Sequence, residues 1–428
     1  MKKKLKFVDL FAGAGGLSLG FKQARRDNGE TAFEAGALID NFEAAKQTYQ
    51  KNNKSAPYHI CDISTISADE IRKLAGLRKN QRLDLLMGGP PCQGFSTLNQ
   101  KARSKNKTFN DFIKDKGNKL LKTFLDLASQ LQPKFILMEN VPNMIRCADK
   151  AYLKEIQKIF DEDGEYTICI KVLNAIEFGV PQLRKRAFLV AVHHDVLNNS
   201  GAEVTNNIIR ELESSDRKNK DFDYYLPKEK FQIVGNGQEL MSAKSKNGYF
   251  AWHVSVKEAI DDLPSLKAGQ TSVIYAKDPS TDYQLDLRNG NERVFNHEAR
   301  SHSAEMQQKM NKIKPGEGNR HLESRDRFEN NGGSKAKVDY LSQAYGRLHP
   351  KGPAYTITCN FQNPGSGFFT HYKDNRTITV REAARLQSFP DDYYFCGNMA
   401  EQTTQVGNAV PPLLAKEIAE HLINIFKL

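Results

Sequence analysis

The sequence predicts an α/β protein with a doubly wound parallel sheet, followed by a second region of irregular structure. Over the first two hundred residues, short apolar runs alternate with helical stretches, as in sheets whose parallel strands are joined by crossover helices. From about residue 194 the chain turns to long polar stretches, such as 198–207, 216–223 and 242–248. A length of 428 residues fits two or three domains.

The individual elements follow from their apolar spacing. Strands are expected at residues 6–11, 33–39, 83–87, 135–138, 166–173 and 186–192. Apolar residues repeat at helical spacing from Leu120 to Ala128 and stop before Pro133, which predicts a helix between the third and fourth strands. The same spacing from Leu414 to Ile425 predicts a C-terminal amphipathic helix that begins after two prolines.

The charge of the chain makes a polyanion the first partner to consider. There are 62 Lys and Arg residues against 51 Asp and Glu, a net charge of +11. Charge alone does not separate nucleic acid binding from an ordinary solvated basic surface. Apolar runs stay well below the roughly 18 residues of a membrane span, so no membrane partner is expected.

The cysteines indicate a reducing compartment. None of the six forms a CxxC pair, so neither a zinc site nor a disulfide framework is predicted, and no metal is expected. The basic N-terminus resembles the start of a signal peptide, but Asp9 and the glycines after it interrupt the apolar stretch. We therefore expect a cytoplasmic protein with reduced thiols.

A glycine-rich turn follows the first strand, from Phe11 to Gly20. Such a turn lets the backbone approach a ligand closely at the carboxyl end of a strand, although it can also be a tight turn without a ligand. Ser18 stands where a dinucleotide fingerprint has its third glycine, which weakens NAD or FAD. Asp40 and Asp62 follow the next apolar segments, so the ordered set favours an adenosine ligand.

A cysteine stands on a rigid turn after the third strand. Pro90 and Pro91 fix the backbone immediately before Cys92, which predicts a thiol pointing into the site as a nucleophile. An average cysteine would instead be an inert part of the core. The fourth strand brings Glu139 to the same edge, where burial of a carboxyl group would favour its protonated form and make it a proton donor.

Gln182, Arg184 and Arg186 occupy alternate positions just before the sixth strand. In an extended segment they share one face. Taken alone, they would be an ordinary basic turn.

Taken together, these motifs resemble those of cytosine-C5 methyltransferases that act on DNA and use S-adenosylmethionine. Six motifs carry the resemblance in the order of the family: Phe11-Ala-Gly-Ala-Gly-Gly, Gly89-Pro-Pro-Cys-Gln-Gly-Phe-Ser, Glu139-Asn-Val, Gln182-x-Arg-x-Arg, Arg381-Glu-Ala-Ala-Arg-Leu-Gln-Ser-Phe-Pro and Gln405-Val-Gly-Asn-Ala-Val-Pro-Pro. The chain departs from the family at Gly117, where an arginine is frequent.

The resemblance implies a Rossmann-like S-adenosylmethionine-dependent methyltransferase domain plus a smaller irregular target-recognition domain. The expected catalytic residues are Cys92, Glu139, Arg184 and Arg186. The expected cofactor-binding residues are Phe11, Gly13, Gly15, Gly16, Leu17, Asp40, Asn41, Asp62, Ile63, Pro90, Leu120, Asn408 and Ala409. The expected DNA contacts are Gln93, Ser96, Arg103, Lys105 and Gln182.

The chemistry of cytosine methylation explains these residue types. C5 is a poor nucleophile until a thiolate, here Cys92, adds to C6 and converts the ring to an enamine that accepts a methyl group from a sulfonium donor. A protonated Glu139 at N3 and Arg186 at the O2 carbonyl would neutralise the charge that builds on the ring. The product of the cofactor would be S-adenosyl-L-homocysteine.

Because these cytosine atoms are inaccessible inside a duplex, the target base must flip into the site. The basic segment 93–117 is then expected to close over it and bind phosphate. We expect residues 1–194 to form the catalytic and cofactor-binding domain, completed by 405–428. Residues 195–380 would form the target-recognition domain, and 381–404 the connection back.

The resemblance further implies a prokaryotic, nucleoid-associated enzyme of the restriction-modification type, acting as a monomer on duplex DNA. The resemblance also allows a partner, a cognate restriction endonuclease that acts separately. Two rival functions are a tRNA cytosine-C5 methyltransferase and a catalytically silent DNA-binding regulator. The Cys-Phe-Thr tripeptide of the tRNA branch is absent, and a silent relative would not need Cys92, Glu139 and Arg186 together.

Overall fold

The computed structural model describes residues 2–53, 57–91, 116–144, 156, 159–160, 165–200, 254–321 and 344–428. The chain divides into two compact units. The first unit comprises Met1–Asn174, Lys185–Glu229 and Leu414–Leu428, and the second comprises Ala175–Arg184 and Lys230–Leu413. The assignment of catalysis and target recognition to particular parts of the chain stays a prediction.

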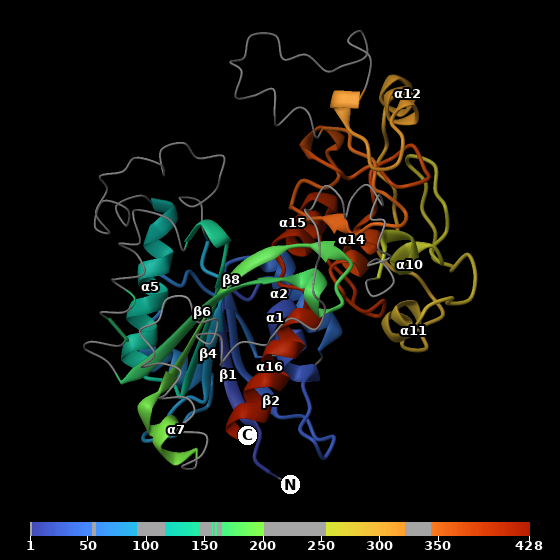
Figure 1. Ribbon diagram of the computed structural model, residues 1–428. Helices are drawn as coiled ribbons and strands as arrows, with labels where there is room; N and C mark the ends of the chain where they lie inside the picture. Colours follow the sequence, from blue (N-terminus) through green and yellow to red (C-terminus); the bar gives the residue numbers. More distant parts are fainter. Residues whose placement is uncertain are drawn as a thin grey trace, which may run out of the picture. The chain divides into compact units, whose positions relative to one another are not determined.

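The first unit is built on a sheet of seven strands, in the order β3-β2-β1-β4-β5-β8-β6 (Figure 1). Their bounds are β1 Leu5–Leu10, β2 Phe33–Asp40, β3 Tyr58–Ile60, β4 Leu85–Gly88, β5 Phe135–Asn140, β6 Tyr166–Asn174 and β8 Lys185–His193. All six predicted strands are present. The seventh, β3, was not predicted, because its three residues are too few to show a pattern.

One strand direction differs from the expected parallel sheet. β1 to β5 pair in parallel, but β8 lies antiparallel between β5 and β6. The connection from β6 to β8, Ala175–Arg184, contains no crossover helix. Because a parallel return needs a dozen or more residues, the shorter connection brings β8 back in the opposite direction.

Helices cover both faces of this sheet. The helices of the first unit are α1 Gly16–Gln23, α2 Glu43–Asn52, α3 Ala68–Leu74, α5 Lys116–Leu131, α7 His194–Asn199 and α16 Pro412–Phe426, of which the last begins in the second unit. Val8 and Leu10 belong to a buried cluster with residues of α3 and α5. Residues on the opposite face pack against α1 and α16: the Phe7 and Phe21 rings lie 6.4 Å apart, and those of Phe135 and Phe426 5.1 Å apart. The predicted helices at 120–128 and 414–425 are therefore confirmed.

The described part of the second unit has little regular structure. Its helices are α10 Val256–Ile260, α11 Asp282–Arg288, α12 Ala304–Lys312, α14 Val380–Leu386 and α15 Met399–Asn408, with 3-10 turns at Ala175–Phe178, Asn319–His321 and Pro364–Ser366. The short strands β7 Gln182–Leu183 and β9 Ala354–Tyr355 pair in parallel. No helix in the described part of the chain is long and apolar enough to span a membrane.

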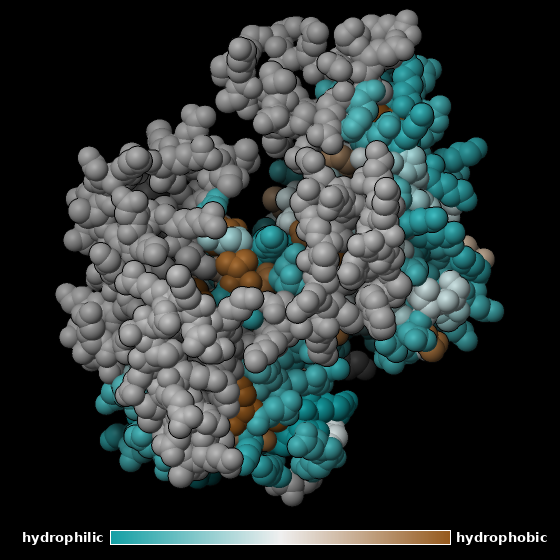
Figure 2. All heavy atoms as spheres, in the orientation of Figure 1, coloured by the Kyte–Doolittle hydropathy of each residue, from teal (hydrophilic) through white to brown (hydrophobic). Residues whose placement is uncertain are grey.

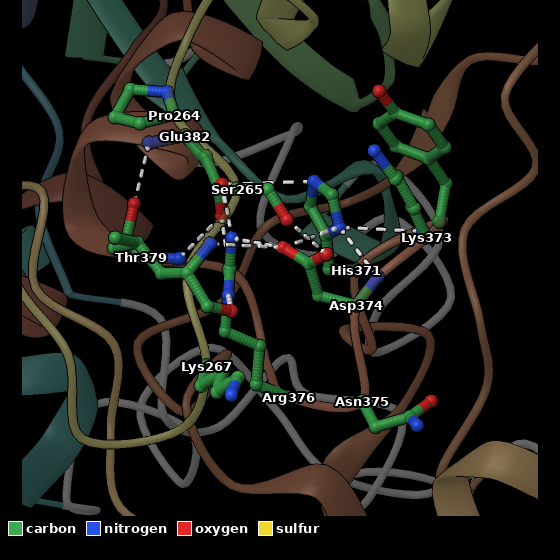
Figure 3. A network of polar contacts seen from close by, with 12 residues as sticks. Pro264, Ser265, Lys267, His371, Lys373, Asp374, Asn375, Arg376, Thr379 and Glu382 are labelled. Atoms are coloured by element: carbon green, nitrogen blue, oxygen red, sulfur yellow. Dashed lines mark hydrogen bonds and ion pairs between the residues drawn. The ribbon is translucent and has the colours of Figure 1, made fainter. Parts of the chain in front are cut away.

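Buried ion pairs hold the second unit together. Arg376, fully buried, reaches both carboxylate oxygens of Glu382 at 2.8 Å and Asp374 at 2.9 Å, as Figure 3 shows. Burial alone would raise the pKa of Glu382, but Arg376 outweighs it and holds that pKa far below its ordinary value. Arg385 likewise pairs with Asp262 and Asp391, all fully buried.

On the face shown in Figure 2, the described surface is mostly hydrophilic.

Gly88 offers a direct test of the packing between β1, β4 and α5. A Cβ atom there would collide with the Leu10 carbonyl and approach the Phe124 ring to 3.1 Å. We expect Gly88→Ala to destabilise the protein by about 1–3 kcal/mol, since the sheet must shift to make room. Urea unfolding measures this. Gly365→Ala is the control, because its nearest neighbour would be 3.4 Å away; equal stability losses would contradict the packing described.

Candidate active site

The glycine turn joins β1 to α1 in a strained conformation. Phe11, Gly13 and Gly15 have φ values of 66°, 51° and 77°, in the left-handed region that glycine adopts easily and phenylalanine rarely. A Cβ at Gly13 would have no atom within 4 Å, so space lies open beside the backbone. No side chain caps the N-terminus of α1 among the described residues. The turn therefore presents backbone to a ligand.

Asp40, at the end of β2, holds this turn in place. Its carboxylate accepts hydrogen bonds from the backbone N–H of Gly13 at 2.8 Å and of Phe42 at 3.0 Å. Burial raises the pKa of Asp40 above its ordinary value, and these bonds oppose the shift. Asp40 thus fixes the glycine turn, and its predicted contact with a ribose would use remaining acceptor positions.

The other predicted cofactor residues of the first unit lie along the same strand ends and helix starts. Asp62 is exposed and accepts bonds from the backbone and side chain of Ser64, which lower its pKa. Ile63 is buried in the core beside it. Gly16 and Leu17 are buried, Asn41 is exposed and Leu120 is half-buried. Their roles stay predictions.

Asp9 is a residue that the sequence analysis missed. It is buried beneath the turn and accepts a hydrogen bond from Ser18, on the first turn of α1. Burial is the main cause that raises the pKa of Asp9 from 3.8 to about 7; the Ser18 bond opposes it and the Asp40 carboxylate adds to it. The signal in the sequence was Ser18 itself, which replaces a glycine and supplies the donor.

Glu139 lies beside the backbone that leads to Cys92. A Cβ at Gly89 would meet the Glu139 Oε2 atom at 3.1 Å, and the Asn140 amide donates to the Pro90 carbonyl at 3.2 Å. The end of β5 is thus packed against the turn after β4. Cys92, Gln93, Ser96, Arg103 and Lys105 lie outside the described residues.

Arg186 forms an ion pair with Glu139. The Arg186 Nε atom lies 2.9 Å from the Glu139 Oε1 atom, and both side chains keep only about a seventh of their surface exposed, 16% and 13%. The pairing of β5 with β8, in which Glu139 is opposite Phe188, brings the two residues together. The structure therefore brings together two predicted catalytic residues, the Glu139 carboxylate and the Arg186 guanidinium. They lie beside the backbone that leads to Cys92, another predicted catalytic residue.

Gln182, Arg184, Asn408 and Ala409 belong to the second unit. Gln182 is fully buried and bonds to Leu386, Gln387 and Ile357. Arg184 is buried and donates to the carbonyls of Ile357 and Gly407. Asn408 is exposed at the end of α15, and Ala409 is buried. No group of three or more His, Cys, Asp or Glu residues in the described ranges could hold a metal ion.

Comparison with known families decides the class of this protein. The model of the family "C-5 cytosine-specific DNA methylase" matches residues 5–424, nearly the whole chain. The chain belongs to this family. As a member, it is an enzyme, a DNA cytosine-5-methyltransferase, and the family predicted from the six motifs is confirmed.

Individual relatives agree with this family. The chain is 30% identical to the type II methyltransferase M.DdeI of Desulfomicrobium norvegicum, over 98% of this chain and 88% of the relative. It is 31% identical to M1.HphI of Haemophilus parahaemolyticus, over 98% and 87%. A solved E. coli structure, described as a prophage-encoded DNA modification methyltransferase, shares the fold with a TM-score of 0.66 and 23% identity, covering 99% and 100% of the two chains.

The buried Asp9 predicts a specific dependence of stability on pH. The folded protein holds the Asp9 proton up to about pH 7, whereas the unfolded chain releases it near 3.8. Stability from this group is therefore complete below about pH 4 and is lost as the pH rises towards 7. Asp9→Asn avoids this loss, so above pH 7 its free energy of unfolding should exceed that of the unchanged protein, by about 4 kcal/mol at most.

Urea unfolding between pH 4.5 and 8 measures this difference. Asp84→Asn is the matched control: Asp84 is buried too, but pairs with Lys134 at 2.7 Å, so its loss should destabilise the protein. A constant offset between Asp9→Asn and the unchanged protein across this range would contradict a protonated Asp9.

Proposed function

We propose that this enzyme transfers a methyl group from S-adenosylmethionine to C5 of a cytosine within a specific duplex DNA sequence. The observation that carries the proposal is the Glu139–Arg186 ion pair beside Gly89, three residues before Cys92. The carboxyl group and the guanidinium lie at one edge of the sheet. With the thiol of Cys92 that the sequence predicts, they match the three demands of cytosine activation.

The glycine turn fits the cofactor. Open space beside Gly13, the N-terminus of α1 without a side-chain cap among the described residues, and the half-buried Asp40 together form a cradle for a ligand with polar groups. Phe11, Asp62 and Pro90 would line the same site, and we also assign cofactor contacts to Asn408 and Ala409. When bound, S-adenosylmethionine supplies an electrophilic methyl group on a sulfonium.

The residues of this chain then act on the cytosine ring. The Cys92 thiolate forms a bond to C6, while Glu139 donates a proton to N3 and Arg186 donates hydrogen bonds to O2. C5 thereby becomes the nucleophile for the methyl group. Loss of the C5 proton to a base, elimination of the thiolate and return of the N3 proton to Glu139 restore the aromatic ring. Glu139 is paired with Arg186, so its contact with N3 requires the incoming base to loosen the ion pair.

The remaining parts of the chain would handle the duplex. We assign phosphate contacts to the segment 93–117, with Arg103 and Lys105, and base reading to residues 195–380. The target cytosine would flip out of the duplex to reach Cys92. The relatives named type II methyltransferases support a prokaryotic restriction-modification role. A cognate endonuclease that acts separately stays a prediction.

Bisulfite sequencing of plasmid DNA from cells that express the chain tests the proposal. We expect protection of cytosines within one short sequence, and none with Cys92→Ala, because the proposed mechanism forms the bond to C6 through the Cys92 thiolate. The purified Cys92→Ala protein should still bind cofactor and DNA, since Pro90 and Pro91 set the turn.

A duplex with 5-fluorocytosine at the mapped site isolates the covalent step. Fluorine at C5 cannot leave as a proton does, so methylation should trap an adduct that survives denaturation and maps to Cys92. An adduct at another cysteine, turnover by Cys92→Ala, or methylation of tRNA but not DNA would contradict the proposal.

A further inference from the structure

The connection between β6 and β8 is buried in the second unit. Antiparallel neighbours are usually joined by an exposed loop of two to five residues. Here the chain leaves the first unit after Asn174, runs through Ala175–Arg184 within the second unit, and returns at Lys185. We call Ala175–Arg184 the strap. Its side chains are largely buried: Ile176, Phe178, Val180, Gln182 and Arg184 are each at most 2% exposed.

Two polar side chains fix the strap to the second unit. Gln182 accepts a hydrogen bond from the Ile357 N–H at 2.8 Å and donates to the Leu386 carbonyl at 3.0 Å. Arg184 donates to the Ile357 carbonyl at 2.9 Å and to the Gly407 carbonyl at 3.1 Å. The Leu386 carbonyl lies in the last turn of α14, and the Gly407 carbonyl in the last turn of α15. A cation such as the Arg184 guanidinium is favourable at the end of a helix.

The backbone adds to this attachment. β7 pairs with β9, the Ala354 N–H donates to the Pro181 carbonyl at 2.9 Å, and the Thr356 hydroxyl donates to the Leu183 carbonyl at 2.7 Å. A loop with so many fixed polar groups is costly to displace, because each lost bond would leave a buried group unsatisfied.

The strap ends two residues before Arg186. The Ala175 N–H donates to the Arg184 carbonyl at 2.9 Å, a hydrogen bond that joins the first and last residues of the strap. The next pairs of the ladder are Asn174 with Lys185 and Leu173 with Arg186. Arg184 immediately precedes β8, so its position fixes where this strand begins. The strand carries Arg186, whose side chain pairs with Glu139.

We propose that Gln182 and Arg184 are positioning residues. Through the strap, the conformation of the second unit sets the geometry of Glu139 and Arg186 for methyl transfer. The inference rests on the proposed function. Arg184 then acts on the reaction through Arg186 and not by touching the cytosine. A cognate sequence held by the second unit would favour the aligned geometry, so the coupling would act on the rate of the chemical step.

Arg184→Lys tests this proposal, with Arg381→Lys as the matched control. Arg381 is also fully buried in the second unit and donates to three carbonyls, of Phe295, Pro390 and Tyr393, none in the strap. Both variants should lose stability. Only Arg184→Lys should lower the single-turnover rate, by about tenfold or more, on a duplex carrying the mapped target. Its dissociation constants for duplex and S-adenosylhomocysteine should stay near those of the unchanged protein.

Hydrogen exchange of the peptide 185–190 gives a second readout that does not depend on activity. Arg184→Lys should accelerate its exchange, and Arg381→Lys should not. Equal single-turnover rates for the two folded variants, unchanged exchange in Arg184→Lys, or a loss confined to affinity would overturn the proposal. An unchanged protein that methylates no DNA would instead overturn the proposed function, while hydrogen exchange still decides on the strap.

Discussion

The candidate active site depends on the ion pair between Glu139 and Arg186. It forms because β8 runs antiparallel beside β5 and carries Arg186 back to the edge where Glu139 ends its strand. A parallel return would have put the start of β8 at the opposite edge of the sheet. The close packing of Gly89 against Glu139 then ties the pair to the turn that leads to Cys92.

In the proposed mechanism each group has a defined task. Arg186 orients the Glu139 carboxyl group before the base enters, and the base must then loosen this ion pair. Asp40 does the same for the glycine turn through Gly13 and Phe42. Beneath the turn, burial raises the pKa of Asp9 to about 7, and we expect its ionisation to cost stability above that pH.

The sequence predicted the strands where the pattern was local, and the candidate site residues, which stay predictions, follow those strands. Strands 33–39 and 135–138 are continuous apolar runs, and the turns after them carry their polar groups at fixed positions. The direction of β8 was not predicted, because it depends on what the segment 175–184 packs against. The same holds for Gln182 and Arg184: their spacing indicates a shared face, but only the structure shows that both are buried in the second unit. Asp9 was missed because its effect arises from burial.

The central claim is that Glu139 and Arg186 act as one unit in methyl transfer. A double-mutant cycle on the single-turnover rate tests it, with Glu139→Gln, Arg186→Met and the double variant, each at saturating duplex and cofactor. The account predicts that each single change slows the reaction by about a hundredfold or more and that the double variant is hardly slower than the worse single one. Rate losses that multiply in the double variant would contradict it.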